Sequence, residues 1–180
     1  MQIKTKNIAV MGFMTALLCV LSPIMVPMPG GIGISLGLFA ILLITYLMGT
    51  IKGLICYGMY IILGAIGLPV FAGFRGGLAV ITGPTGGYLI GYIAVIIIVG
   101  IFQYLGKNKM WMYILGSVLG ISLCYIIGSI WFIHITETGF KQAVWICIIP
   151  YIPFDVVKII AVCIIGPVLK KHTNKIFTES

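Results

Sequence analysis

One acidic and one basic residue lie three positions apart in a stretch of sequence that is otherwise almost wholly apolar. They are Asp155 and Lys158, in the run PYIPFDVVK at 150–158. On a helix, residues at i and i+3 share a face, and a charge inside a hydrophobic span is kept mainly where it faces protein, water or a substrate. Pro150 and Pro153 interrupt the helical hydrogen bonds just upstream. The pattern predicts a broken helix that presents both charges to a small-molecule site, the alternative being a structural ion pair between helices.

The chemistry of this pair suits the recognition of a urea, amide or carboxylate group. An aspartate accepts N–H bonds from a urea or amide, and a lysine donates to a carbonyl or carboxylate. Because Pro153 stands just before it, Asp155 is expected to be an early residue of the inner half-helix. Exposed N–H groups and the positive end of the helix dipole help to hold an anion at that position.

Two further side chains are candidate ligand contacts. Arg75 lies in a glycine-rich connection over 69–83, and its guanidinium fork suits a carboxylate. A solvated charge on the outer surface explains Arg75 equally well. Tyr88 follows the connection, where it either stacks on a ligand ring or lines the helix bundle.

Several chemistries are excluded by what the sequence lacks. GPTGG at 83–87 has neither the following Lys-Ser/Thr nor the preceding strand of a phosphate loop, so this chain alone is not expected to hydrolyse ATP. No paired carboxylates and no Ser/His/Asp or Cys/His arrangement can be recognised, so we expect no enzyme. His134 and His172 have no Cys, His or acidic neighbour at ligand spacing, so no metal or cofactor is expected. Buried apolar packing is the favoured role of the cysteines, which form no CxxC pair: Cys19, Cys56, Cys124, Cys147 and Cys163.

The composition places the candidate residues in a membrane protein. Hydrophobic residues make up 61% of the chain and charged residues 8%, and the mean hydropathy is +1.23. A soluble domain has about 45–50% apolar and about 25% charged residues. About six spans of roughly 20 residues fit this length. We predict an all-α integral membrane protein with one six-helix bundle over residues 1–180, its spans at about 8–26, 34–51, 53–68, 84–105, 111–134 and 143–169.

The basic residues divide unevenly between the two ends of these spans. Six spans put both termini on one side, which collects Lys4, Lys6, Lys52, Lys107, Lys109, Lys170, Lys171 and Lys175. The other side has only Arg75 and Lys141, with Glu137. The positive-inside rule therefore predicts cytoplasmic termini. The same rule explains the net charge of +8 better than a nucleic-acid partner does, because no basic cluster is interleaved with aromatic residues.

The predicted depth of the charged pair points to the outer side of the membrane. Lys158 precedes Lys170 by about 18 Å of ideal helix, and Asp155 lies about 22 Å from the same end. The hydrocarbon core is about 30 Å thick, so both side chains fall in its outer half, toward Arg75. The polar groups thus converge on the outer face, as uptake requires.

Small residues recur at helix-packing intervals. The GxxxG pairs at 87–91 and 116–120 are expected to form contacts inside the bundle. Ala9, Gly12 and Ala16 share one face of the first span, and small residues at this spacing let another helix come close.

Two stretches of the sequence resemble a known family. The run GAIGLPVFAGFRGGLAVITGPTGGYLIGY, Gly64 to Tyr92, resembles the signature of biotin-specific S components of energy-coupling factor (ECF) transporters, the BioY family. PYIPFDVVK resembles the motif in that family's last helix, and the similarity covers essentially the whole chain. The resemblance implies a multi-pass protein of a prokaryotic cell membrane that binds biotin from outside, in a pocket closed by outer loops. It also implies partners: a membrane coupling protein and two ATP-binding cassette ATPases, which drive release inward.

The resemblance also assigns residues to the pocket. Asp155 and Lys158 match the family's ligand-contacting positions. Gly73, Gly76 and Gly77 fall in the run that matches its pocket loop, although many members read GGSGG there. A contact between Arg75 and a ligand carboxylate is an inference from chemistry, since Arg75 departs from the family pattern.

The first span carries the second implied site. In related S components, a small-xxx-small stripe on the first helix forms the face that docks on the coupling protein. Gly12-x-x-x-Ala16, with Ala9 nearby, matches that stripe in kind.

Three other functions remain open. An S component for a different vitamin would use the same architecture. A membrane-embedded enzyme could use Asp155 as an acid or base, although the sequence offers no second catalytic partner. A structural membrane subunit would use Asp155 and Lys158 only to hold helices together.

Overall fold

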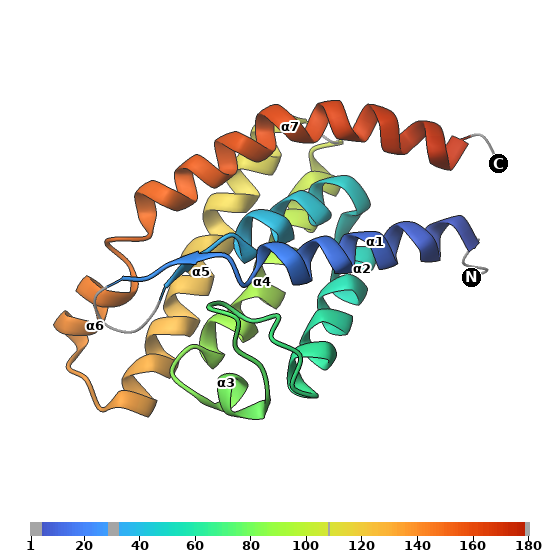
Figure 1. Cartoon of the computed structure of the whole chain (residues 1–180). Coiled ribbons are helices and arrows are strands. Elements are labelled where there is room, and N and C mark those ends of the chain that lie inside the picture. The colour runs from blue at the N-terminus through green and yellow to red at the C-terminus, as the bar shows by residue number, and fades with distance from the viewer. Residues whose placement is uncertain (1–4, 29–32, 108, 179–180) are drawn as a thin grey trace.

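The structure is an assembly of helices, with a small hairpin between the first and second helices and a long loop between the second and third (Figure 1). The computed structural model describes residues 5–28, 33–107 and 109–178. Its helices are α1 (Thr5–Leu21), α2 (Gly37–Ala65), α3 (Leu78–Thr82), α4 (Gly86–Leu105), α5 (Met110–Thr136), α6 (Phe140–Cys147) and α7 (Ile152–Thr178). Two short strands, β1 (Met25–Val26) and β2 (Ile34–Ser35), pair antiparallel.

The expectation of an all-α membrane protein is confirmed. Within the described residues, four segments are long and apolar enough to cross a bilayer: α2, α4, α5 and the stretch Phe140–Lys171. Large apolar side chains such as Phe13, Ile130 and Ile164 are more than 60% exposed, which water would penalise and a bilayer would not. The orientation of the termini stays a prediction, and Lys4 lies outside the described residues. Lys52, Lys107 and Lys170 line one open cleft and therefore share an end of the bundle.

Helix α2 is folded back on itself at Gly49. This residue has φ 77° and ψ −176°, which no helical residue adopts. In a straight helix, residues eight positions apart are separated by about 12 Å. A Cβ added to Gly53 would lie only 3.8 Å from the Cα of Thr45, so the chain turns back between these two residues. The sequence therefore predicted two helices here correctly, but it placed the break near Lys52, a few residues late.

Replacing Gly49 with alanine is expected to lower the stability of the fold by about 1–3 kcal/mol, because this region of φ/ψ space is open almost only to glycine. No atom lies within 4 Å of an added Cβ, so backbone strain alone would cause the loss. The thermal midpoint of the purified protein in detergent measures it. Gly58→Ala is the control, because Gly58 is helical with equally open surroundings and should be neutral or slightly stabilising. Equal midpoints for the two variants would contradict the strain at Gly49.

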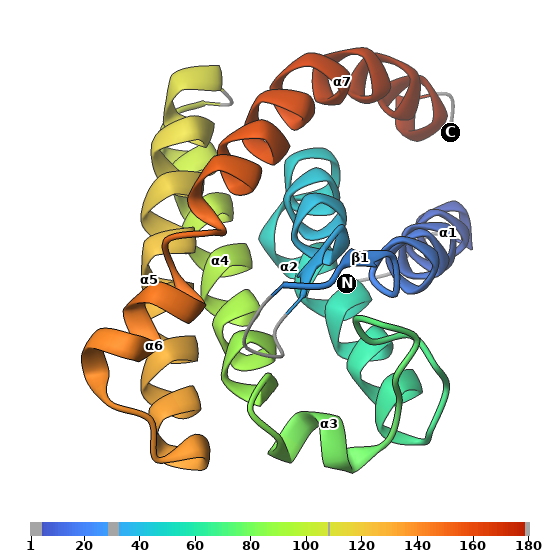
Figure 2. The same ribbon diagram turned by 60° about the vertical axis from the view of Figure 1, so that its left-hand side comes forward.

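The centre of the bundle is formed by α2, which packs against α1, α4 and α7 (Figure 2). The most extensive helix–helix contact is between α4 and α5. A Cβ on Gly91 would lie 2.6 Å from the Cys124 sulfur, and one on Gly120 would lie 3.2 Å from the Cα of Val95. The predicted GxxxG packing is confirmed, since any larger residue at these positions would force the two helices apart.

The last predicted span is interrupted where its prolines stand. Helix α6 ends at Cys147, residues 148–151 form turns, and α7 begins at Ile152. Proline removes a backbone donor and crowds the preceding turn, which explains the break. Asp155 consequently lies in the first turn of α7, as expected, and its N–H bonds to the carbonyl of Tyr151.

The first predicted span, 8–26, was too long at its end. Helix α1 ends at Leu21 because Pro23 disfavours helical geometry at the residue before it. The chain then forms the β1–β2 hairpin, which the sequence did not predict. Ile34 of this hairpin packs with Phe132, Cys147 and Tyr151 in a small apolar cluster. Through Ile34, the hairpin packs against the C-terminal parts of α5 and α6.

Candidate ligand-binding site

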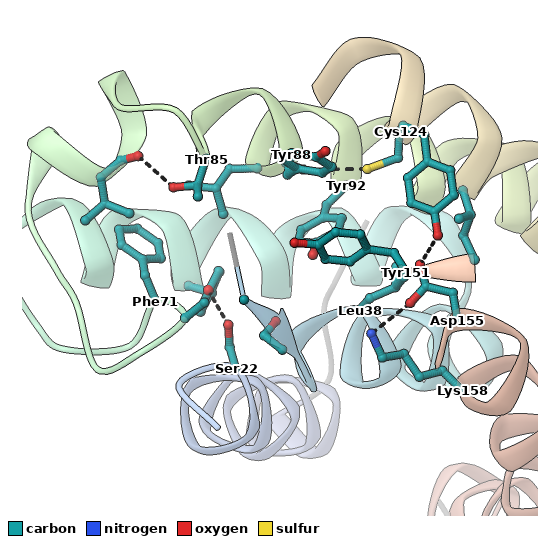
Figure 3. A pocket seen from close by; sticks show the side chains of 18 of the residues that line it. Ser22, Leu38, Phe71, Thr85, Tyr88, Tyr92, Cys124, Tyr151, Asp155 and Lys158 are labelled. Atoms are coloured by element: carbon teal, nitrogen blue, oxygen red, sulfur yellow. Dashed lines mark hydrogen bonds and ion pairs between the residues drawn. The ribbon is translucent and has the colours of Figure 1, made fainter. Parts of the chain in front are cut away.

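A pocket lies among the hairpin, the loop before α3, and helices α2, α4, α5 and α7. It has about 730 Å³ of unfilled space, counted with its open mouth. Figure 3 shows Asp155 and Lys158 at one end, Ser22 and Phe71 toward the other, and Tyr92 and Tyr151 between them. Pockets that bind small molecules have this character: mainly apolar walls with a few convergent polar groups.

The charged pair forms the polar end of the pocket. Lys158 Nζ donates to Asp155 Oδ1 at 2.8 Å, and Tyr125 Oη donates to Asp155 Oδ2. Both charged residues are buried, at 4% and 8% exposed, so their mutual attraction is little screened by solvent. Among the described residues, the ammonium makes this one hydrogen bond, and its other two N–H groups are available to a ligand. Asp155 and Lys158 are therefore bonded to each other, and both still line the pocket.

Aromatic side chains form most of the side walls. Tyr60 hydrogen bonds through its hydroxyl to Ser22 at 2.6 Å, and its ring contacts Phe71 edge-on. Tyr92 and Tyr151 line the space between the two ends. Aromatic faces of this kind pack well against a compact apolar ring system.

Sequence reasoning missed most of these aromatic residues. Tyr92 follows Tyr88 by four residues and so shares its helix face, and Tyr151 lies inside the PYIPFDVVK run; both patterns could have been used. Tyr60 and Tyr125 gave no comparable indication, because their place in the pocket depends on how separate helices pack.

Arg75 and Tyr88 both line the pocket. Arg75 is exposed near the mouth, and its Nε donates to the carbonyl of Ala72 at 3.1 Å. Its backbone pairs with Phe71 in an isolated bridge, which shapes the loop. Tyr88 donates its hydroxyl to the carbonyl of Cys147, so that side chain offers a ligand its ring rather than its oxygen.

The three glycines of the loop do not themselves line the pocket, as the structure places them. Gly73 has φ 75° and donates its N–H to Pro23, whereas Gly77 has φ 91° and donates to Gly64. A Cβ on Gly76 would collide with the carbonyl of Leu68. These positions let the loop turn and lie close to neighbouring backbone.

The small residues of α1 lie away from the pocket. Ala9, Gly12 and Ala16 are all exposed on one face of the helix. An added Cβ on Gly12 would meet nothing within 4 Å. The stripe is therefore uncovered by the rest of the described chain.

The chemistry that the pocket supports is binding. A carboxylate and an ammonium are held in place next to aromatic rings, and no second carboxylate lines the described walls. Among the side chains that the structure describes, in residues 7–28, 33–107 and 109–171, no group of three His, Cys, Asp or Glu residues could hold a metal ion. A bundle of apolar helices around such a pocket defines a membrane-embedded protein that binds a small molecule.

Comparison with known proteins identifies the family. The statistical model of the BioY family matches residues 1–175. The chain therefore belongs to the BioY family.

Two similar proteins and a solved structure agree with this assignment. The biotin transporter BioY of Thermotoga maritima is 33% identical over 160 residues, covering 89% of this chain and 93% of that protein. The probable biotin transporter BioY of Pyrococcus horikoshii is 35% identical over 170 residues, covering 94% and 99%. A crystal structure of the S-component for biotin from an ECF-type ABC transporter superposes with a TM-score of 0.85, at 28% identity over 93% of this chain and 92% of that one. These relatives are transport proteins, which agrees with the expectation that the chain is not an enzyme.

Proposed function

We propose that this chain is the biotin-capturing S component of an ECF-type uptake transporter in the cell membrane of a prokaryote. The observation that carries the proposal is the pocket that contains Asp155 and Lys158. The names of the relatives and of the solved structure support biotin as the ligand. The chain itself captures the vitamin, while a membrane coupling protein and two ATP-binding cassette ATPases supply the energy for inward release.

The chemistry of biotin fits the two ends of the pocket. Asp155 accepts an N–H of the ureido ring, and Lys158 donates to the ureido carbonyl. Tyr92 and Tyr151 cover the apolar thiophane ring and the start of the tail. Arg75, at the mouth, pairs with the valerate carboxylate.

Titration calorimetry of the purified protein tests this function directly. Biotin should give saturable heat, and thiamine, riboflavin and folate should give none. Saturable binding of one of these vitamins instead of biotin would make the chain an S component of different specificity. Absence of binding by all four would favour the structural subunit.

Replacing Arg75 with glutamine is expected to weaken biotin binding by about threefold to fivefold. The effect is modest because Arg75 is exposed, and exposed ion pairs contribute about 0.2–1 kcal/mol. Calorimetry with biotin and with its neutral amide measures the carboxylate contact: the original protein should prefer biotin, and the variant should lose that preference. Lys141→Gln is the control, since Lys141 is exposed and does not line the pocket. A variant that still prefers biotin over its amide would place the carboxylate elsewhere.

A further inference from the structure

The pocket shares a wall with a groove on the outside of the bundle. The groove runs between α5 and α7 and has about 840 Å³ of unfilled space, counted with its open side. Ile121, Tyr125 and Asp155 line both the pocket and the groove. Asp155 thus borders the groove as well as the pocket, although only 4% of the residue is exposed.

The groove faces the bilayer. Its other lining residues are almost all apolar and come from segments long enough to cross a membrane. Ile126 and Val156, on its two sides, are 54% and 49% exposed. Lipid tails are the medium that covers such a surface in a membrane protein. A carboxylate in open contact with that medium would be costly, so some group must shield Asp155 from it.

Tyr125 is placed to provide this shield. It is half-buried, and its hydroxyl donates to Oδ2 of Asp155 while Lys158 occupies Oδ1. The two donors together fix the rotation of the carboxylate. The side chain that makes the hydrogen bond also forms part of the wall that the pocket and the groove share.

We propose that Tyr125 is a positioning residue and a seal: its hydroxyl orients the Asp155 carboxylate for the ligand, and its ring separates the pocket from the lipid-facing groove. The orienting role rests on the proposed biotin-binding function. The sealing role stands without it.

The orienting role is tested by Tyr125→Phe, which keeps the ring and removes the hydroxyl. Biotin affinity should fall about tenfold, the size expected for one charge-assisted hydrogen bond. In an Asp155→Asn background, the same change should alter affinity by less than about twofold, because its partner has already been changed. An equal loss in both backgrounds, or no loss in either, would overturn the orienting role.

The sealing role is tested with dicyclohexylcarbodiimide, a reagent that partitions into the bilayer. The Asp155 carboxylate takes a proton from the Lys158 ammonium and adds across one C=N bond of the reagent, which gives an O-acylisourea. The acyl group then either migrates to nitrogen, so that the whole reagent stays attached, or is taken by the Lys158 amine, which leaves an Asp155–Lys158 amide and releases dicyclohexylurea. Mass spectrometry locates both products, the first by the mass of the added reagent and the second by the loss of one water, and their sum is the extent of labelling.

The protein is reconstituted into phosphatidylcholine vesicles without biotin. Tyr125→Ala should label at Asp155 at least about tenfold faster than Tyr125→Phe. Both variants lack the hydroxyl, so the difference between their labelling rates reports the effect of the ring alone.

Two further variants keep the labelling result decisive. Ile126→Ala trims the groove but not the shared wall, and it should label as slowly as the original protein. Tyr125→Leu fills more of the space than alanine, so it replaces Tyr125→Ala if that variant does not fold; it too should label faster than Tyr125→Phe. Equal labelling of the phenylalanine variant and the folded alanine or leucine variant would overturn the seal. If the original protein binds no biotin, the proposed function fails, and the labelling still decides the seal.

Discussion

Leucine at Gly12 or Ala16 is expected to abolish assembly with the coupling protein and biotin uptake while leaving biotin binding unchanged. Both residues are exposed on α1, and a Cβ on Gly12 would meet nothing in the chain, so the larger side chains fit the isolated fold. Close approach of a partner helix over small residues would be blocked by leucine. Co-purification from membranes, uptake of labelled biotin by cells and calorimetry on the isolated chain measure the three properties.

Gly58→Leu is the matched control for this experiment. Gly58 is also a helical glycine whose added Cβ would meet nothing within 4 Å, but it lies on α2. It should leave assembly and uptake intact. If the Gly12 and Ala16 variants co-purify with the coupling protein as well as this control does, the docking face lies on another part of the surface. If they lose biotin binding too, the stripe belongs to the fold rather than to an interface.

The sequence predicted the fold where a residue type has one dominant physical effect. Pro150 and Pro153 indicated the break between α6 and α7, because proline removes a helical donor wherever it stands. The same effect at Pro23 ends α1 at Leu21, before the predicted end of the first span. The bend in α2 was harder to place, since glycine occurs both inside helices and at turns, and only packing shows that Gly49 takes a positive φ.

The candidate site was predictable only in part for a similar reason. Asp155 and Lys158 were identified because a charge within an apolar span is costly and needs an explanation. Tyrosine carries no such cost, so nothing in the sequence distinguishes Tyr125, which contacts Asp155 across 30 residues of chain, from tyrosines elsewhere. Glycine is ambiguous in another way: the residue type does not show whether Gly76 borders a ligand or another stretch of backbone.

Neutralising the charged pair one partner at a time should separate its role in stability from its role in binding. Asp155→Asn is expected to weaken biotin binding by about 1–3 kcal/mol, through loss of charge-assisted hydrogen bonds. Lys158→Met should be more damaging to stability, by about 3–5 kcal/mol, because it leaves a buried carboxylate without its countercharge. Thermal midpoints and calorimetry measure the two effects on the same preparations.

The double variant Asp155→Asn/Lys158→Met decides between the two roles. It contains no buried charge at the site, so its thermal midpoint should recover toward that of the original protein. Biotin binding should stay weakened by more than about a hundredfold, because the charge-assisted contacts to the ureido group and the lysine donor are gone even though the fold is restored. A double variant that binds biotin like the original protein would show that the pair only holds α7 together, and the ligand would have to be recognised by other residues of the pocket.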